Sequence, residues 1–154
     1  MKVILDKPQL NISLLRLAHQ LLENIDDLAQ VVFIGLQPRG IFVSNKIVEI
    51  IKQLSPKQKI QYGILDITFY RDDVRDELHT AIKTDIPFTI EGKKVILMST
   101  STGGTLSLKL AANFPEIAGL ILYSPNIEIN NPSAFLLNDP WGLQIRTMLF
   151  GFQL

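Results

Sequence analysis

The chain has 154 residues and a mass of 17.3 kDa, the size of one ordinary domain, which buries a sufficient core without a metal or disulfide. It has no cysteine and two histidines, which excludes disulfides, thiolate metal sites and cysteine nucleophiles and disfavours a histidine-rich metal centre. Fifteen basic and fifteen acidic residues cancel, so no net charge favours nucleic acid or a membrane. With no signal peptide and no membrane-spanning apolar run, we expect a cytoplasmic protein without a membrane partner.

The charged residues are unevenly distributed along the chain. Residues 1–97 carry 13 basic and 12 acidic side chains, whereas residues 98–154 carry five charges in 57 positions. A globular domain usually has about a quarter of its residues charged. The charge-poor segment is therefore expected to be buried or covered, and we expect the chain to form a homo-oligomer.

Apolar residues at helical and strand-like spacing predict the elements of the first half. A first helix is expected over Asn11–Asn24, with Asn11 or Ser13 as its cap. The apolar run Val31–Gly35 is typical of a buried parallel strand, and a helix is expected over Ile41–Leu54.

The second half continues the alternation of strands and helices. The sequence predicts strands over 59–70, 94–98 and 119–125, helices over 105–114 and 140–150, and a charged excursion over 71–85. This alternation predicts a single α/β domain over residues 1–154, with a three-layer, mainly parallel open sheet. Binding sites in such sheets lie at the carboxyl ends of the strands, where the loops QPRG, YRDD and STSTGG are expected. The first and third loops should open on the same edge.

Two of these loops carry charged side chains. Arg39 and Gly40 at a strand-to-helix turn could bind a diphosphate, although an Arg-Gly turn without an anion is the commoner case. Asp66 and the run Arg71, Asp72 and Asp73 could bind magnesium or orient a substrate, and the alternative is a solvated charge run.

Residues 1–97 resemble the PyrR family of pyrimidine operon attenuators, which are also uracil phosphoribosyltransferases. The resemblance rests on the stretches MKVILDKPQL, LLRLAHQLL, VVFIGLQPRGIFVSNKI, ILDITFYRDDV and IPFTIEGKKVIL, in family order. It implies a type I phosphoribosyltransferase fold with Arg39 and Gly40 in the pyrophosphate loop. It also implies that Arg71–Asp85 form a hood over the substrate, and that Arg16 and His19 contact messenger RNA.

The sequence departs from this family after Leu97. The family would continue with two aspartates that hold the ribose of 5-phosphoribosyl-1-pyrophosphate, followed by a Thr-Gly-x-Thr phosphate cradle. Here the aspartates are absent, while Thr102, Gly103, Gly104 and Thr105 keep the cradle at a predicted helix start. We therefore expect weak binding of phosphate or a nucleotide and impaired transfer. No cofactor is expected, except magnesium if phosphoribosyl pyrophosphate binds.

The stretch from Ser99 to about residue 147 resembles an α/β-hydrolase of the esterase or lipase type. The sequence Ser-Thr-Ser-Thr-Gly stands where that family has Gly-x-Ser-x-Gly, which makes Ser101 the nucleophile position. The family's histidine follows its serine in the sequence, but the last histidine of this chain is His79. The triad is therefore incomplete, and we expect Ser101 to be inactive in ester hydrolysis.

Three interpretations stay open from sequence alone. The chain is a phosphoribosyltransferase-like protein of PyrR ancestry with weak or no catalysis, an α/β-hydrolase fragment, or a chimera joined near Leu97–Ser99 without a selected function. The missing aspartates count against full activity in the first, and the missing histidine counts more strongly against the second.

Overall fold

A computed structural model describes residues 6–68 and 83–125. Along the chain these residues form α1 (Lys7–Glu23), a short 3-10 helix η1 (Leu28–Gln30), β1 (Val31–Leu36), α2 (Gly40–Leu54), β2 (Gln61–Leu65), β3 (Lys94–Ser101), α3 (Thr102–Asn113) and β4 (Ile117–Pro125). The expected helix over 140–150 and nearly all of the excursion over 71–85 lie outside the described residues.

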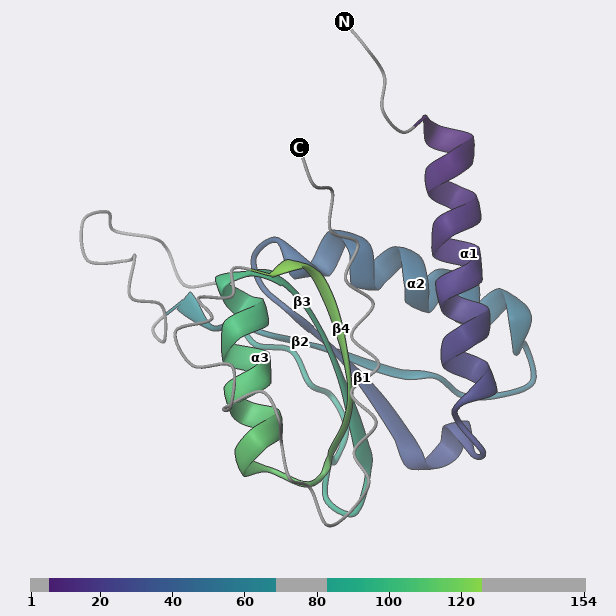
Figure 1. The fold of residues 1–154 in the computed structure, drawn as a ribbon. Helices are drawn as coiled ribbons and strands as arrows, with labels where there is room; N and C mark the ends of the chain where they lie inside the picture. Colours follow the sequence, from purple (N-terminus) through teal and green to yellow (C-terminus); the bar gives the residue numbers. More distant parts are fainter. Residues whose placement is uncertain (1–5, 69–82, 126–154) are drawn as a thin grey trace, which may run out of the picture.

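The four described strands form one parallel sheet in the order β2-β1-β3-β4. In its centre Phe33 of β1 lies between Tyr62 of β2 and Ile96 of β3. Helices α1 and α2 lie on one side of the sheet and α3 lies on the other (Figure 1). The expected three-layer α/β arrangement with an open sheet is therefore confirmed, and the described sheet is entirely parallel.

Alternate side chains of the central strands supply the two halves of the core. In β1, Val31 and Phe33 face α1 and α2, whereas Val32, Ile34 and Leu36 face α3. All six residues of β1 are buried, as the continuous apolar run predicted. The largest fully buried side chains on the α1 and α2 side are Phe33, Ile47, Ile51 and Met98.

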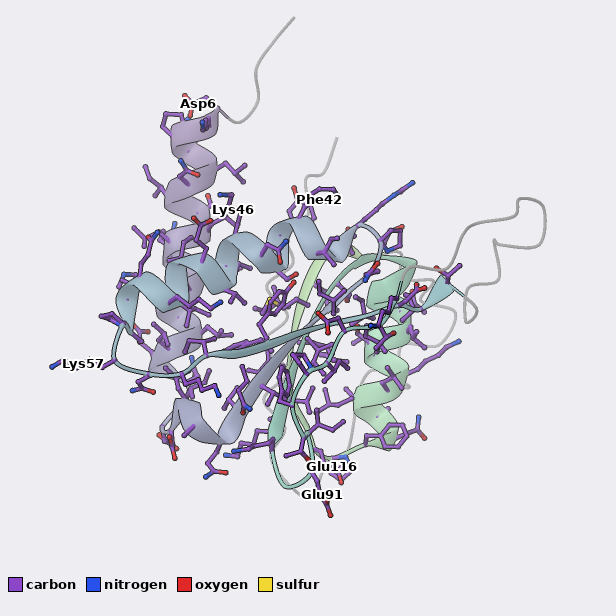
Figure 2. The ribbon with its side chains drawn as sticks, turned by 180° about the vertical axis from the view of Figure 1, so that it is seen from behind. Asp6, Phe42, Lys46, Lys57, Glu91 and Glu116 are labelled. Atoms are coloured by element: carbon purple, nitrogen blue, oxygen red, sulfur yellow. The ribbon has the colours of Figure 1, made fainter. Side chains whose placement is uncertain are left out.

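Helix α1 begins four residues earlier than predicted. Asp6, not Asn11 or Ser13, caps it, because its side chain accepts a hydrogen bond from the Gln9 backbone and the Gln9 side chain accepts one from the Asp6 backbone. This reciprocal capping box fixes the first turn. Asp6 marks the end of α1 that projects from the rest of the fold (Figure 2).

The other boundaries differ from expectation mainly around the sheet. Helix α2 is confirmed within one residue, whereas β2 is five residues long where twelve were expected. Strand β3 runs on to Ser101, because Ser99–Ser101 pair with Leu122–Pro125 of β4. The expected STSTGG loop was therefore wrong: its first half is strand and its second half is helix.

The two ends of the sheet differ in the side chains they carry. Phe42, in the first turn of α2, lies at the end where β1 and β3 stop, and Glu91 and Glu116 lie at the opposite end (Figure 2). Glu91 precedes β3 and Glu116 precedes β4, so these carboxylates are kept away from the carboxyl ends of the strands. Arg39 lies at the carboxyl end, where parallel sheets place their ligands.

Candidate functional site

The loop after β1 places a basic side chain at the start of α2. Gln37, Pro38 and Arg39 connect the strand to the helix, and Arg39 is the N-cap residue. Its backbone is already helical, with φ −85° and ψ −27°, and its exposed side chain makes no capping hydrogen bond. Arg39 therefore stands directly before the first N–H groups of α2, and a cation at this position and those N–H groups would both attract an anion.

Gly40 brings the start of α2 against β3. A Cβ atom at this position would lie 3.0 Å from the carbonyl oxygen of Met98 and 3.2 Å from Cα of Ser99. Both neighbours are backbone atoms of a central strand, which cannot move aside cheaply. Only glycine allows the first turn of α2 to lie directly beside the end of β3.

Strand β3 passes into α3 with no intervening residue. Ser101 is the last strand residue and Thr102 the first helical one, so the chain must turn at a single position. Ser101 has φ 54° and ψ −128°, and within residues 6–68 and 83–125 it is the one non-glycine residue with a positive φ. Such a conformation costs about 1–3 kcal/mol and concentrates at functional sites.

The two turns line one small cavity at the carboxyl end of the sheet. Its lining comes from the end of β1 and the loop after it, from Ile67, and from the β3–α3 turn: Leu36, Gln37, Pro38, Arg39, Gly40, Ile67, Thr100, Ser101 and Gly103. The turn after β1 and the β3–α3 turn therefore open on the same edge, as was predicted for the first and third loops. No acidic side chain is among the described lining residues, and the starts of two helices meet there, so this part of the cavity favours an anion.

A pair of hydrogen-bonded hydroxyls lies behind each turn, part-buried at the first turn and buried at the second. Under the first turn, Ser44 Oγ lies 2.7 Å from the Tyr62 hydroxyl, and burial raises the pKa of Tyr62 while the hydrogen bond to Ser44 acts in the opposite direction. Under the second turn, Ser99 Oγ lies 2.8 Å from Ser107 Oγ, and Ser107 also donates to the Gly103 carbonyl oxygen at 2.9 Å. These bonds hold each helix to a strand of the sheet.

The structure brings some of the predicted site residues together and separates others. Arg39, Gly40, Ser101 and Gly103 all line the cavity, while Gly104 is buried and Thr105 half-buried in the first turn of α3. Thr102 opens that helix, and only its backbone is described.

The remaining predicted site residues lie elsewhere. Arg16 and His19 are exposed on α1 and do not line the cavity. Arg71, Asp72 and Asp73 lie outside the described residues. Asp66 accepts hydrogen bonds from the backbone and hydroxyl of Thr68, so its carboxylate stabilises its own turn.

Gln37 is a cavity residue that the sequence analysis missed. Its side chain is only 4% exposed and donates through Nε2 to the Lys83 carbonyl oxygen at 3.4 Å. A glutamine in a predicted loop is ordinarily exposed, and the partner lies 46 residues further along the chain. The one available signal was its position directly after a buried strand and before Arg39.

Residues 6–68 and 83–125 contain no group of three or more His, Asp or Glu side chains that could hold a metal ion, and no described residue of the cavity lining is acidic. In the same residues, no helix is both long and apolar enough to cross a membrane.

A second cavity lies between α1 and the edge strand β4. It measures about 150 Å³ and is lined mainly by apolar side chains, among them Leu17, Leu21, Ile25, Leu120 and Ile121. Its polar contributions come from Gln20 and Asn24 of α1, and the Asn24 side chain already donates to the Gln20 carbonyl oxygen. Its described lining offers apolar surface and no charged group.

No protein-family model matches the chain. Proteins named bifunctional protein PyrR are similar to much of it: that of Elusimicrobium minutum is 38% identical over 115 residues, which is 72% of this chain and 64% of the relative. That of Enterococcus faecalis is 35% identical over 117 residues with the same shares. That of Gloeothece citriformis is 41% identical over 96 residues, 62% of this chain and 54% of the relative. Over most of its length the chain is therefore similar to PyrR proteins.

The similarity to PyrR proteins extends further along the chain than residues 1–97, the range expected from sequence. The chain spans less than two thirds of the length of these PyrR relatives. A match of 72% of 154 residues covers about 111 residues, so it continues past Leu97. Strand β3 also runs without interruption through Leu97–Ser99. The comparisons give no support to a hydrolase fragment or to a junction between two parents.

Proposed function

We propose that the chain is a phosphoribosyltransferase-like protein of PyrR ancestry that binds the phosphate end of a nucleotide or sugar phosphate, with impaired transfer. The observation that carries this proposal is the convergence of Arg39 and the starts of α2 and α3 on one cavity. The similarity to PyrR proteins supports the same ancestry.

The cavity chemistry supports binding of an anion better than transfer of a ribosyl group. Backbone N–H groups at two helix starts and the Arg39 guanidinium are donors that suit an anion. Gly103 lets the start of α3 pack closely on the sheet, because a Cβ there would lie 3.4 Å from Cβ of Ser99 and 3.5 Å from the Ile67 side chain. The two aspartates of the family pattern are absent after Leu97. Each lost charge-assisted hydrogen bond removes about 1.5–3 kcal/mol, so we expect millimolar affinity.

A phosphate titration followed by amide chemical shifts tests the anion site. We expect Gly40, Gly103, Gly104 and Thr105 to shift together, and Arg39→Ala to weaken binding severalfold. Lys52→Ala is the matched control, because Lys52 is an exposed cation in the last turn of the same helix. If these amides do not move by tens of millimolar phosphate, the two turns are ordinary helix starts and the proposal fails.

An assay with uracil and 5-phosphoribosyl-1-pyrophosphate tests the expected impairment. The described part of the cavity lining has no carboxylate that could hold the ribose hydroxyls or an accompanying magnesium ion. We expect no turnover above background. Turnover that is lost in the Arg39→Ala variant would contradict the proposal that transfer is impaired, while the proposed PyrR ancestry would still stand.

RNA is the second partner that this ancestry suggests. Arg16 and His19 are exposed and three residues apart on α1, so they share one face of the helix. If this face contacts RNA phosphates, Arg16→Ala should weaken binding and reduce the slope of log affinity against log salt by about one. An unchanged slope would remove Arg16 from the interface.

The turn at Ser101 is the one observation that favours a serine hydrolase. A serine with positive φ between a strand and a helix is the geometry of a nucleophile elbow. Among the described residues, no histidine or carboxylate lines the cavity to take its proton. We therefore expect negligible hydrolysis of a short-chain nitrophenyl ester, unchanged by Ser101→Ala; serine-dependent hydrolysis would overturn this expectation.

Self-association is also part of the proposed behaviour. Exposed apolar side chains lie on the projecting half of α1, where Ile12 is 58% and Leu15 42% exposed, and at Phe42 of α2, which is 74% exposed. Covering such surface favours association. A strictly monomeric species at tens of micromolar by light scattering would contradict it.

A further inference from the structure

The cavity between α1 and β4 is an apolar site that the proposed function does not use. It measures about 150 Å³, and its lining comes from one side of α1, from Ile96 and from the first half of β4. A dry cavity of this size holds about one benzene ring, whereas a drug-sized ligand needs a pocket of about 300 Å³ or more. The occupant that fits is therefore a single apolar side chain.

The side of α1 that faces this cavity carries no charge along the whole helix. At about 100° per residue, one side of α1 and its C-cap collects Leu10, Ser13, Leu17, Leu21 and Asn24. Leu17, Leu21 and Asn24 line the cavity, and Leu10 continues this side beyond the cavity, with 38% of its surface exposed. The charge-free surface therefore extends past the cavity as a groove along α1.

The wall of the groove that β4 provides is low and open. Ala118 and Gly119 line the cavity with the smallest side chains available, and Ala118 is exposed. Strand β4 is also the outer strand of the described sheet, beside β3. Proteins ordinarily cover such an edge with a helix or a loop. An apolar segment that lies along this groove would fill the cavity and cover the edge together.

The sequence after Pro125 contains a segment with the right pattern. Residues 140–152 include one charged residue, Arg146. If the helix predicted over 140–150 continues to residue 152, four apolar side chains at i, i+4, i+7 and i+11 share one face, and Arg146 falls on another: Trp141, Ile145, Met148 and Phe152. The same spacing occurs in α1 at Leu10, Leu14, Leu17 and Leu21. Matching rows of this kind allow two helices to pack side by side.

The connecting residues are long enough to bring this segment to the groove. Residues 126–139 span up to about 46 Å when extended, at about 3.3 Å per residue. The cavity residues of β4, Ala118–Ile121, lie within about 25 Å of Pro125 along the strand. A helix over 140–150 is about 16 Å long, which is enough to cover α1 from Leu17 to its C-cap.

We propose that residues 140–152 of this chain dock in the groove between α1 and β4 and place an aromatic side chain in the cavity. The docked segment covers the edge of the sheet and joins the C-terminal part of the chain to α1. This proposal is independent of the anion site, which lies at the carboxyl end of the strands.

Trp141 reports on this docking, because it is the one tryptophan of the chain. In the full chain at low micromolar concentration, we expect its fluorescence emission to be blue-shifted. We also expect acrylamide to quench it severalfold less than in the same chain unfolded by denaturant. Emission and quenching equal to those of the unfolded chain would overturn the proposal.

Substitutions in the groove test where Trp141 is buried. Ala118→Asp places a carboxylate in the exposed lining and should shift emission and quenching towards the unfolded values. Ala112→Asp is the matched control, because Ala112 is an exposed alanine of α3, on the other side of the sheet, and should leave both unchanged. Gln20→Glu charges the lining from α1 and should act as Ala118→Asp does, should that variant fold poorly. Unchanged quenching in the folded groove variants would overturn the proposal.

A spin label distinguishes docking within the chain from docking onto a second copy. The chain has no cysteine, so Glu23→Cys offers one attachment point, on an exposed residue of α1 that does not line the cavity. The label should broaden the indole N–H signal of Trp141 in its own chain. It should not do so when labelled chains are mixed with unlabelled, isotope-enriched ones. Broadening only in the mixture would assign the groove to a second copy, and no broadening in either sample would exclude docking; both results overturn the proposal.

Discussion

The turn after β1 and the turn after β3 perform the same topological task by different means. Both end a central parallel strand, begin a helix and line the same cavity. The first uses residues 37–39 as a loop, whereas the second uses no loop and concentrates the reversal at Ser101. The first turn can therefore present long side chains, and the second presents chiefly backbone.

Each of the two turns is also supported by a pair of hydrogen-bonded hydroxyls that joins its helix to the sheet. The Ser44–Tyr62 pair joins α2 to β2 across Gly35, and the Ser99–Ser107 pair joins α3 to β3. In each case a buried serine of the helix bonds a hydroxyl of the sheet. Precise placement of a helix start thus depends on a polar contact within an otherwise apolar layer.

Gly35→Ala should separate the Ser44–Tyr62 hydroxyl pair and cause the largest loss of stability. The new Cβ would collide with Ser44 Oγ and lie 2.8 Å from the Tyr62 hydroxyl, so the bonded pair must separate. We expect about 2–3 kcal/mol of destabilisation in denaturant unfolding. Gly119→Ala is the control, because its Cβ meets only the end of the Ile96 side chain, at 3.2 Å. Equal losses at the two glycines would contradict a role for the hydroxyl pair.

Ser107→Ala should remove the Ser99–Ser107 hydrogen bond and cause a smaller loss of stability. It leaves Ser99 Oγ buried without its partner, which we expect to cost about 1–2 kcal/mol. Adding Ser99→Ala removes the orphaned hydroxyl and should restore part of the stability. Denaturant unfolding of the two single variants and the double variant measures this coupling; strictly additive losses would mean that the two hydroxyls act independently.

Ser101→Gly should sharpen the contrast between the two turns by stabilising the protein. Glycine adopts a positive φ without the clash that serine suffers, although it also makes the unfolded chain more flexible. We expect a net gain of about 1 kcal/mol in the free energy of unfolding. Ser101→Ala retains the Cβ and should show no gain. A destabilised Ser101→Gly variant would mean that the serine side chain supports the turn.

The difference between the turns also marks how far the sequence could predict the structure. Strand β1 and helix α2 were predicted within one residue, because a continuous apolar run and a helical period are strong local signals. The shared edge of the two turns followed from parallel topology. The end of β3 was missed, because Ser99–Ser101 are polar and become strand only by pairing with β4.

The same distinction holds for the candidate site. Arg39, Gly40 and Gly103 were predicted from residue type and position after strands. Gln37 could not be predicted, since its burial depends on a contact with Lys83, far along the chain. The positive φ of Ser101 was not predicted either. The polar residues STSTGG suggested a loop between strand and helix, whereas β3 passes directly into α3 and the chain turns at Ser101 alone.

The smallest expected effect is a pH dependence of stability that distinguishes the two hydroxyl pairs, since only the Ser44–Tyr62 pair contains a titratable group. Burial raises the pKa of Tyr62 above its ordinary value, so the folded state holds the phenol proton more tightly than the unfolded state does. The stability that this provides is complete below about pH 10 and is lost as the pH rises through the folded pKa. Tyr62→Phe should cost about 0.5–1 kcal/mol at pH 8 through the lost bond to Ser44, and the difference from wild type should shrink above pH 10. Unfolding free energies of both proteins between pH 8 and 11 measure this. A difference that grows with pH would mean that the fold stabilises the ionised tyrosine, contrary to its burial.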